Sequence, residues 1–195
     1  MSPSIVLALI SAYVVGSIAF ARLFGRLHGL EATNGGVIGP VELRRQVGWG
    51  PAAMAMVGDV LKGLVAAAMG TVASGRGDAM GVWAFAVGGM AVVGDCYPLF
   101  YRFRGGRGVA PLVGVLLFTV PLAGVVVTAL WALLAALRLP DWWTVSLPVV
   151  AIVLAVWQGV AGASVGVLTV TCALVAWRHR SNLVPTRRPR READE

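Results

Sequence analysis

Residues 80–110, MGVWAFAVGGMAVVGDCYPLFYRFRGGRGVA, join an apolar segment (80–100) to a short run of arginine and glycine, after which the chain becomes apolar again. A helix needs about 20 apolar residues to cross the hydrocarbon core of a bilayer, which is roughly 30 Å thick. The segment meets this length, and the arginines would then lie at the membrane edge. This stretch therefore predicts a transmembrane helix that ends in a basic loop at the membrane surface.

The rest of the chain has the same character, with 58% hydrophobic and 13% charged residues and a mean hydropathy of +0.81. Most apolar segments show no polar face at helical spacing, which excludes a soluble helical bundle. We predict an all-α integral membrane protein of about seven transmembrane helices, near residues 4–24, 51–73, 80–100, 108–121, 122–137, 142–159 and 160–177. Five helices are the alternative, but one of them would then run from 142 to 177, well beyond the usual length.

The net charge of +7 comes from arginines, with Lys62 as the one lysine. Thirteen of the fifteen arginines lie in three groups that border the apolar segments, at 22–45, 102–107 and 178–191. Because basic loops stay in the cytoplasm, all three groups are expected there, which requires an external N-terminus, a cytoplasmic C-terminus and an odd number of helices. Anionic lipid headgroups are therefore the expected partners of these charges, and nucleic acid is not expected.

The domain organisation follows from the same pattern. Residues 1–180 form one transmembrane domain, and the basic tail 181–195 is predicted to be disordered in the cytoplasm. Cys96 and Cys172 lie in apolar surroundings without metal-ligand spacing, so we expect free core cysteines and no metal site.

The arginine–glycine run consists of Arg104, Gly105, Gly106, Arg107 and Gly108. Glycines let backbone N–H groups close on an anion, and the start of the following helix carries positive partial charge. Arginine adds planar, bidentate binding of phosphate oxygens. The run therefore predicts a phosphate-binding loop, with a purely topological anchor as the alternative.

Three charged residues lie inside apolar segments, away from the segment ends. Asp59 and Lys62 are three positions apart, so they share a helix face and are expected to pair. Ion pairs within a membrane are functional by default, although a pair that only fixes helix packing is the alternative. Asp95 also needs a cationic partner, for which the arginines of 102–107 are the nearest candidates.

Two further positions could contribute polar groups. Ser17 follows Gly16 near the middle of the first predicted helix, where its hydroxyl can bond to the carbonyl one turn earlier. His179 and Asn182 share a face if the last helix continues by one turn. A histidine can act as a general base near neutral pH and an asparagine can orient a hydroxyl, whereas a basic interfacial cap is the alternative.

In order and spacing, these motifs resemble the bacterial acyl-phosphate:glycerol-3-phosphate acyltransferase family. The resemblance implies seven transmembrane helices in the plasma membrane and acyl transfer from acyl phosphate to the sn-1 hydroxyl of glycerol 3-phosphate. The product would be lysophosphatidate, in the first step of phospholipid synthesis, and no metal or organic cofactor is implied. The resemblance to this family rests on the motifs Gly16-Ser17, Asp59-Val60-Leu61-Lys62-Gly63, Gly94-x-x-x-Pro98, Gly105-Gly106-Arg107-Gly108-Val109-Ala110 and Arg178-His179-x-x-Asn182.

The resemblance also implies roles for single residues. It makes His179, Asn182 and Ser17 catalytic and gives Asp59 and Asp95 supporting roles. The family's Lys-Gly-Gly-Lys-Gly loop appears here with arginine in place of both lysines. Phosphate and substrate binding is assigned to Arg104, Gly105, Gly106, Arg107, Gly108, Lys62 and Arg45.

The glycine-rich loop at 25–50 departs from the family pattern, Arg-x-x-Gly-Ser-Gly-Asn-x-Gly-Ala-Thr-Asn. Five polar or cationic positions of that pattern are occupied here by Glu31, Gly35, Val37, Val41 and Glu42. In addition, Asp95 stands where the family has histidine. Two alternatives therefore stay open: an acyltransferase with a changed acceptor, or a catalytically silent paralogue that binds anionic lipid or acyl phosphate.

Overall fold

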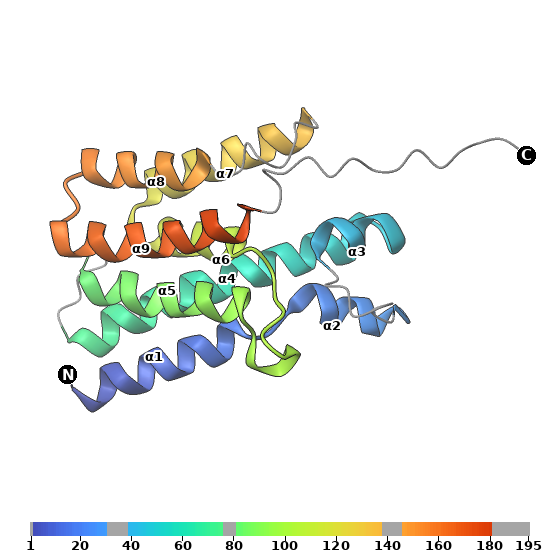
Figure 1. The fold of residues 1–195 in the computed structure, drawn as a ribbon, viewed down its shortest axis with the longest axis horizontal. Coiled ribbons are helices and arrows are strands. Elements are labelled where there is room, and N and C mark those ends of the chain that lie inside the picture. The colour runs from blue at the N-terminus through green and yellow to red at the C-terminus, as the bar shows by residue number, and fades with distance from the viewer. Residues whose placement is uncertain (1, 31–38, 76–80, 138–145, 181–195) are drawn as a thin grey trace, which may run out of the picture.

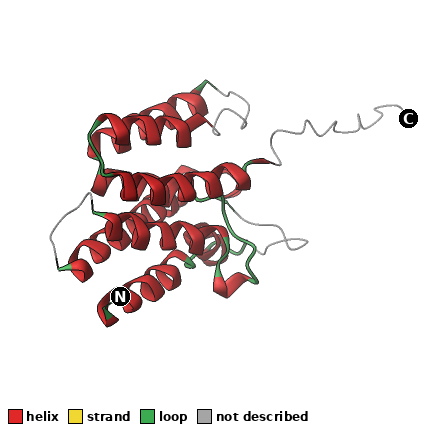
Figure 2. Ribbon diagram, turned by 60° about the vertical axis from the view of Figure 1, so that its left-hand side comes forward, coloured by secondary structure: helices red, strands yellow, loops and turns green. Residues whose placement is uncertain are grey.

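The structure, a computed structural model, describes residues 2–30, 39–75, 81–137 and 146–180. Within these residues the regular structure is helical, as the absence of yellow in Figure 2 shows. Each of the apolar segments expected from the sequence contains at least one helix (Figure 1). The elements are α1 (Pro3–Gly16), α2 (Phe20–Leu27), α3 (Pro40–Gln46), α4 (Trp49–Ser74), α5 (Val82–Cys96), η2 (Leu99–Tyr101), α6 (Val109–Thr119), α7 (Pro121–Ala136), α8 (Ser146–Trp157) and α9 (Gly162–Arg178).

The first expected helix, 4–24, is interrupted, which the sequence analysis did not anticipate. α1 ends at Gly16, Ser17 caps it, and α2 begins at Phe20. The break leaves carbonyl groups without helical partners, and Lys62 Nζ donates to two of them, those of Gly16 (3.1 Å) and Ile18 (3.0 Å). A buried ammonium therefore stabilises the interruption.

Three helical segments, 3–27, 49–74 and 82–101, are long and apolar enough to cross a membrane. The four apolar helices α6 to α9 are shorter, and α6 with its 11 residues rises only about 16 Å. The chain is a multi-pass membrane protein, while seven complete crossings stay a prediction. α8 and α9 are separate helices, so the single helix across 142–177 of the five-helix alternative is wrong.

The centre of the bundle is the contact between α4 and α6, where two glycines allow the backbones to touch. A Cβ at Gly63 would lie 1.9 Å from the carbonyl oxygen of Pro111, and one at Gly114 would lie 1.9 Å from that of Val60. Only glycine fits at such distances, as is common where membrane helices approach closely. The first turn of α6 is thereby held against α4, the helix that contains Asp59 and Lys62.

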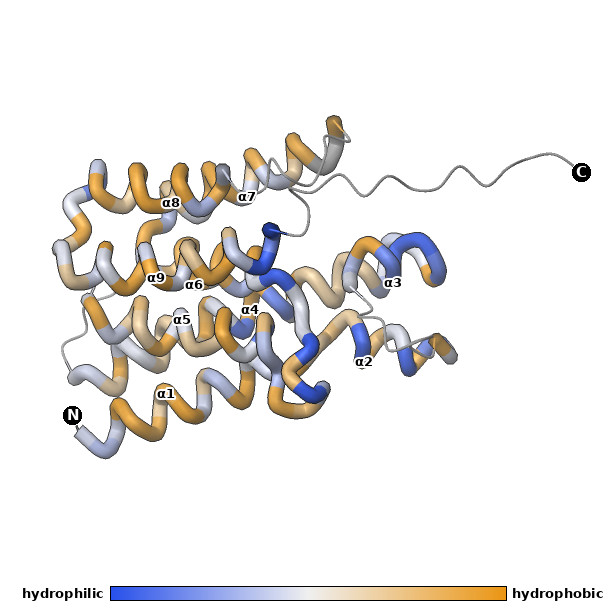
Figure 3. Tube along the Cα trace, in the orientation of Figure 1, coloured by the Kyte–Doolittle hydropathy of each residue, from blue (hydrophilic) through white to orange (hydrophobic). Residues whose placement is uncertain are grey.

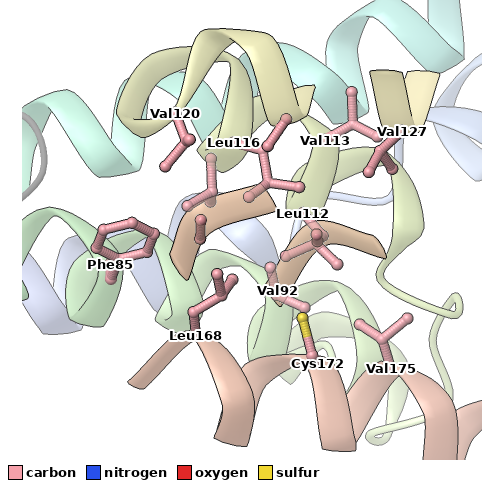
Figure 4. Close-up of a cluster of buried hydrophobic side chains, with 14 of the residues drawn as sticks. Phe85, Val92, Leu112, Val113, Leu116, Val120, Val127, Leu168, Cys172 and Val175 are labelled. Carbon is pink, nitrogen blue, oxygen red and sulfur yellow. The ribbon is translucent and has the colours of Figure 1, made fainter. Parts of the chain in front are cut away.

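The main apolar core fills the space between α5, α6 and α9 (Figure 4). Phe85 and Val92 of α5 and Leu116 of α6 are almost completely buried there, together with Leu168 and Val175 of α9. Both cysteines are free and buried, which confirms the sequence prediction.

Strongly hydrophilic residues gather at one end of the bundle, around α2, α3, the loop before α6 and the end of α9 (Figure 3). The N-terminal end of α1 lies at the opposite end (Figure 1). Arginine side chains stack on aromatic rings at the polar end of the bundle. Tryptophan and tyrosine rings are enriched at membrane–water interfaces. Three of these stacks are Arg22 over Tyr101 at 4.6 Å, Arg44 over Trp49 at 4.6 Å and Arg180 over Trp177 at 3.7 Å. That this end is cytoplasmic stays a prediction, and the tail 181–195 lies outside the described residues.

Candidate active site

The glycine loop (residues 105–108) connects η2 to α6 at the polar end of the bundle. The chain enters it through Arg102 and Phe103, which have φ values of 52° and 59°, a conformation that residues other than glycine rarely adopt. It leaves through Gly108, at φ 78°, directly before the first turn of α6. The loop is thus a sharply turned segment that ends at a helix N-terminus.

Asp95, near the end of α5, lies directly beneath this loop. Its backbone carbonyl accepts a hydrogen bond from the N–H of Gly106 (2.9 Å), and its carboxylate Oδ2 accepts one from the N–H of Gly108 (3.1 Å). A Cβ at Gly105 would lie 2.0 Å from the Asp95 carbonyl oxygen, so a larger residue does not fit there. Two of the N–H groups expected to close on an anion are therefore bonded to Asp95 instead.

The cationic partner of Asp95 is Lys62, not one of the arginines that the sequence analysis favoured. Lys62 Nζ lies 2.7 Å from Asp95 Oδ1 and 2.8 Å from Asp59 Oδ1, so the expected pair with Asp59 is confirmed. Since Lys62 also donates to the carbonyls of Gly16 and Ile18 and is only 3% exposed, it lies beneath the loop rather than on its surface. It joins α4 and α5 to the end of α1.

Arg178, the last residue of α9, holds the other side of the loop. Its Nη2 donates to the carbonyl oxygens of Gly105 (3.0 Å) and Gly106 (3.1 Å), and its Nε donates to that of Gly106 (3.3 Å). Its guanidinium also lies over the ring of Tyr97, 5.0 Å from the centroid. These contacts attach the end of α9 to the phosphate loop predicted from the sequence.

His179 follows directly and is 2% exposed. Its Nδ1 lies 2.8 Å from the carbonyl oxygen of Val175. Because a carbonyl can only accept, Nδ1 carries the hydrogen of the neutral ring and Nε2 carries the lone pair that a general base uses. The predicted partner Asn182 lies outside the described residues.

A family model described as "Glycerol-3-phosphate acyltransferase" matches residues 6–188. This chain belongs to the glycerol-3-phosphate acyltransferase family. It is 36% identical over 185 residues to the glycerol-3-phosphate acyltransferase of Rubrobacter xylanophilus, covering 91% of this chain and 88% of the relative. It is 37% identical over 179 residues to that of Pseudomonas paraeruginosa, with 89% and 91% covered.

A solved structure supports the same assignment. The crystal structure of PlsY, an integral membrane glycerol 3-phosphate acyltransferase in its glycerol 3-phosphate form, superposes with a TM-score of 0.82. It shares 26% identity, with 92% of this chain and 90% of that chain covered. The chain is therefore a membrane acyltransferase, an enzyme of phospholipid synthesis.

In this acyltransferase, Ser17 fastens the broken first helix to the segment before the glycine loop. Its hydroxyl donates to the carbonyl of Tyr13 (2.8 Å), which confirms the expected bond to the preceding turn. The same oxygen accepts a hydrogen bond from the N–H of Leu99 (3.2 Å). Ser17 is completely buried, so both contacts fix the backbone next to the site.

Residues 31–38 of the glycine-rich loop at 25–50 are not among the described residues, so Glu31, Gly35 and Val37 lie outside them. Arg45 is exposed on α3, at the polar end of the bundle. The carboxylate of Glu42 accepts a hydrogen bond from Gln46 on the same helix. Glu42 is therefore engaged along α3.

Arg22 is a site residue that the sequence analysis missed, because it was counted only among the topological arginines. Its Nη2 donates to the carbonyl of Arg104 (3.1 Å) while its guanidinium stacks on Tyr101. It thus connects α2 to the entrance of the loop. The only signal in the sequence was a cation within the first apolar segment.

An apolar groove of about 520 Å³ runs between α1, α5 and α9. Val93 and Leu174 line it near the ends of α5 and α9, and Leu9 and Ala86 line it farther along the helices. Because Leu174 is one helical turn before Arg178, the groove starts close to the residues that hold the glycine loop. Among the described residues, no group of three or more metal-ligating side chains is present.

Proposed function

We propose that this chain transfers an acyl group from acyl phosphate to the sn-1 hydroxyl of glycerol 3-phosphate in a bacterial plasma membrane, forming lysophosphatidate. The observation that carries the proposal is the attachment of Arg178 to the glycine loop, which brings His179 next to a phosphate-binding segment. Family membership supports the same reaction.

Arg104 and Arg107 bind the phosphate groups. Both side chains are exposed at the polar end of the bundle, where a charged headgroup is in reach. Because Asp95 takes the N–H groups of Gly106 and Gly108, the guanidiniums carry more of this binding than the loop backbone does. Arg45 on α3 contributes a further cation for the acceptor.

The reaction is a nucleophilic acyl transfer. The acceptor hydroxyl oxygen attacks the acyl carbonyl carbon, the bond from that carbon to the phosphate oxygen breaks, and phosphate leaves with the electron pair. The hydroxyl proton goes to His179 Nε2 or to a phosphate oxygen of the substrates, and Asn182 orients the hydroxyl. The guanidiniums stabilise the negative charge on the carbonyl oxygen and on the departing phosphate.

The acyl chain lies in the groove between α1, α5 and α9. The groove has an apolar lining and begins beside the loop, so a lipid tail can lie there while its phosphate reaches Arg104 and Arg107. Anionic lipids surround the polar end, where the arginine–aromatic stacks follow the interface.

Ser17, Lys62 and Asp59 act by positioning. The Ser17 hydroxyl bonds to two backbone groups, and Asp59 forms an ion pair with Lys62 beneath the loop, which suits these residues to fix the site rather than to contact a substrate. This differs from the catalytic role of Ser17 and the phosphate-binding role of Lys62 implied by the resemblance.

The test uses the purified protein in lipid with acyl phosphate and labelled glycerol 3-phosphate. Wild type is expected to form labelled lysophosphatidate, and His179→Ala to lose most of this activity, since general acid–base groups contribute about 10²- to 10⁴-fold. His28→Ala is the matched control, because His28 Nδ1 is also 2.8 Å from the carbonyl four residues earlier but the residue is exposed on α2. Product no greater in wild type than in His179→Ala would refute the reaction.

The departures in the acceptor loop are tested with the same protein and a panel of acceptors: glycerol 3-phosphate, glycerol and dihydroxyacetone phosphate. Transfer to another acceptor alone would overturn the acceptor assignment and leave the acyltransferase intact. Binding of acyl phosphate without transfer to any acceptor would instead identify a silent paralogue.

A further inference from the structure

Asp95 holds the glycine loop at two places, one on each side of Arg107. Its backbone carbonyl accepts from the N–H of Gly106 (2.9 Å), and its carboxylate Oδ2 accepts from the N–H of Gly108 (3.1 Å). Contact is tight, since a Cβ at Gly106 would lie 2.7 Å from Oδ2. The carboxylate therefore fixes the exit of the loop into α6.

Lys62 keeps this carboxylate in place. Its Nζ lies 2.7 Å from Asp95 Oδ1, so the two oxygens of Asp95 have different partners, the ammonium and the loop. Lys62 is itself held by Asp59 and by the carbonyls at the end of α1. The orientation of the Asp95 side chain is thus set by α4 and α1.

Arg178 holds the same loop from α9 through carbonyl groups instead of N–H groups. It donates to the carbonyl of Gly106, which belongs to the peptide group preceding Arg107. Asp95 accepts from the N–H of Gly108, which belongs to the peptide group following Arg107. Gly106 and Gly108 would otherwise allow the peptide groups beside Arg107 to rotate. Rotation of the peptide group after Arg107 would turn a carbonyl toward the Asp95 carboxylate, and rotation of the one before it would turn an N–H toward the Arg178 guanidinium. Both rotations are therefore opposed by like charge.

We propose that the Asp95 carboxylate is a positioning residue that, with Lys62 behind it, fixes the peptide group after Arg107 and so, together with Arg178 at the peptide group before it, directs the Arg107 guanidinium toward the substrate phosphate. This rests on the proposed function, in which Arg107 binds phosphate.

The test compares Asp95→Asn with Asp59→Asn. Each variant removes one negative charge from the surroundings of Lys62, but only Asp95 contacts the loop. An amide has a single oxygen, so in Asp95→Asn either Lys62 or the Gly108 N–H faces an NH₂ group. We expect kcat/KM to fall by about tenfold to a hundredfold in Asp95→Asn, with a higher KM for the phosphate substrates. Asp59→Asn is expected to lose less activity than Asp95→Asn at a comparable loss of thermal stability, because it removes one partner of Lys62 but leaves the Gly108 contact in place.

Hydrogen–deuterium exchange supplies a readout that does not depend on turnover. The amide of Gly108 is expected to exchange faster in Asp95→Asn than in wild type, and unchanged in Asp59→Asn. If wild type does not acylate glycerol 3-phosphate, the proposed function fails while the exchange result still shows whether Asp95 holds the loop. If Asp95→Asn does not fold, Asp95→Ser, which keeps a small polar side chain but lacks the carboxylate, takes its place in both measurements, with the same expected results.

Two results would overturn the proposal. One is an equal loss of activity in the Asp95 and Asp59 variants with unchanged exchange at Gly108, which would indicate a general effect of charge on the bundle. The other is faster exchange at Gly108 with full activity, which would show that the orientation of Arg107 does not depend on this contact.

Discussion

Arg178 donates two hydrogen bonds to the carbonyl oxygen of Gly106, from Nη2 at 3.1 Å and from Nε at 3.3 Å, although 72 positions separate them in the chain. The contact attaches the end of α9 to the start of α6. Because His179 is the next residue, any movement of the loop relative to α9 would change the position of His179 relative to the loop, where we propose that phosphate binds. The contact therefore determines the geometry of the candidate site.

Replacing Arg178 by lysine tests this attachment. A lysine keeps the charge but lacks the planar fork that reaches two carbonyls at once. We expect kcat/KM to fall by about tenfold to a hundredfold, measured as lysophosphatidate formation in lipid. Arg180→Lys is the matched control, because Arg180 stacks on Trp177 at 3.7 Å, and it should stay near wild type. Equal losses in both variants would show that the attachment does not govern activity.

Gly105→Ala tests how tightly the loop lies on α5. The new Cβ would be 2.0 Å from the Asp95 carbonyl oxygen and 2.3 Å from Pro98 Cδ, so the loop must move away from Asp95. Activity should be lost even where the variant still folds. Gly162→Ala, at the start of α9 with no atom within 4 Å of the added Cβ, is the control and should keep both activity and the thermal midpoint in detergent. Normal activity in Gly105→Ala would contradict the observed loop geometry.

The sequence predicted the helices well where length and composition decide them. Apolar segments long enough to cross a bilayer favour the helix, because a helix satisfies its backbone groups within the segment. The break after Gly16 was not predicted, since its cause is tertiary: the freed carbonyls are bonded by Lys62, 46 positions away. The local sign of that interruption is the Gly16-Ser17 pair, since glycine–serine pairs occur at helix kinks, but the pair alone does not specify a break.

For the site, contacts within a helix turn were predictable and contacts between helices were not. Asp59 and Lys62 pair as their spacing indicated, and Ser17 bonds to Tyr13 one turn earlier. The partner of Asp95 was chosen from arginines nearby in sequence, whereas Lys62 reaches it because α4 and α5 pack side by side. Lys62 is buried beside Asp95, whereas Arg104 and Arg107 are exposed, and the sequence does not indicate how deep each side chain lies in the bundle.

Lys62→Met tests the charge balance beneath the loop. It would leave Asp59 and Asp95 buried near each other without a cation, and removing one partner of a buried ion pair costs about 3–5 kcal/mol. We expect a large fall of the unfolding midpoint in detergent. The double variant Lys62→Met/Asp95→Asn should recover part of it, because one uncompensated carboxylate is gone. Strictly additive losses would show that the two residues do not act as a pair.

Gly166→Phe tests whether the groove receives the acyl chain. Gly166 lines the groove, has no atom within 4 Å of an added Cβ, and lies 12 residues before Arg178, about 18 Å along α9. A phenyl group there would block the far part of the groove and leave the part near the loop open. Turnover of palmitoyl phosphate should therefore fall while that of octanoyl phosphate is kept, in a side-by-side assay. Val153→Phe, exposed on α8 away from the groove, should leave the ratio of the two rates unchanged. An unchanged ratio in Gly166→Phe would place the acyl chain elsewhere, because a filled groove cannot hold a long tail.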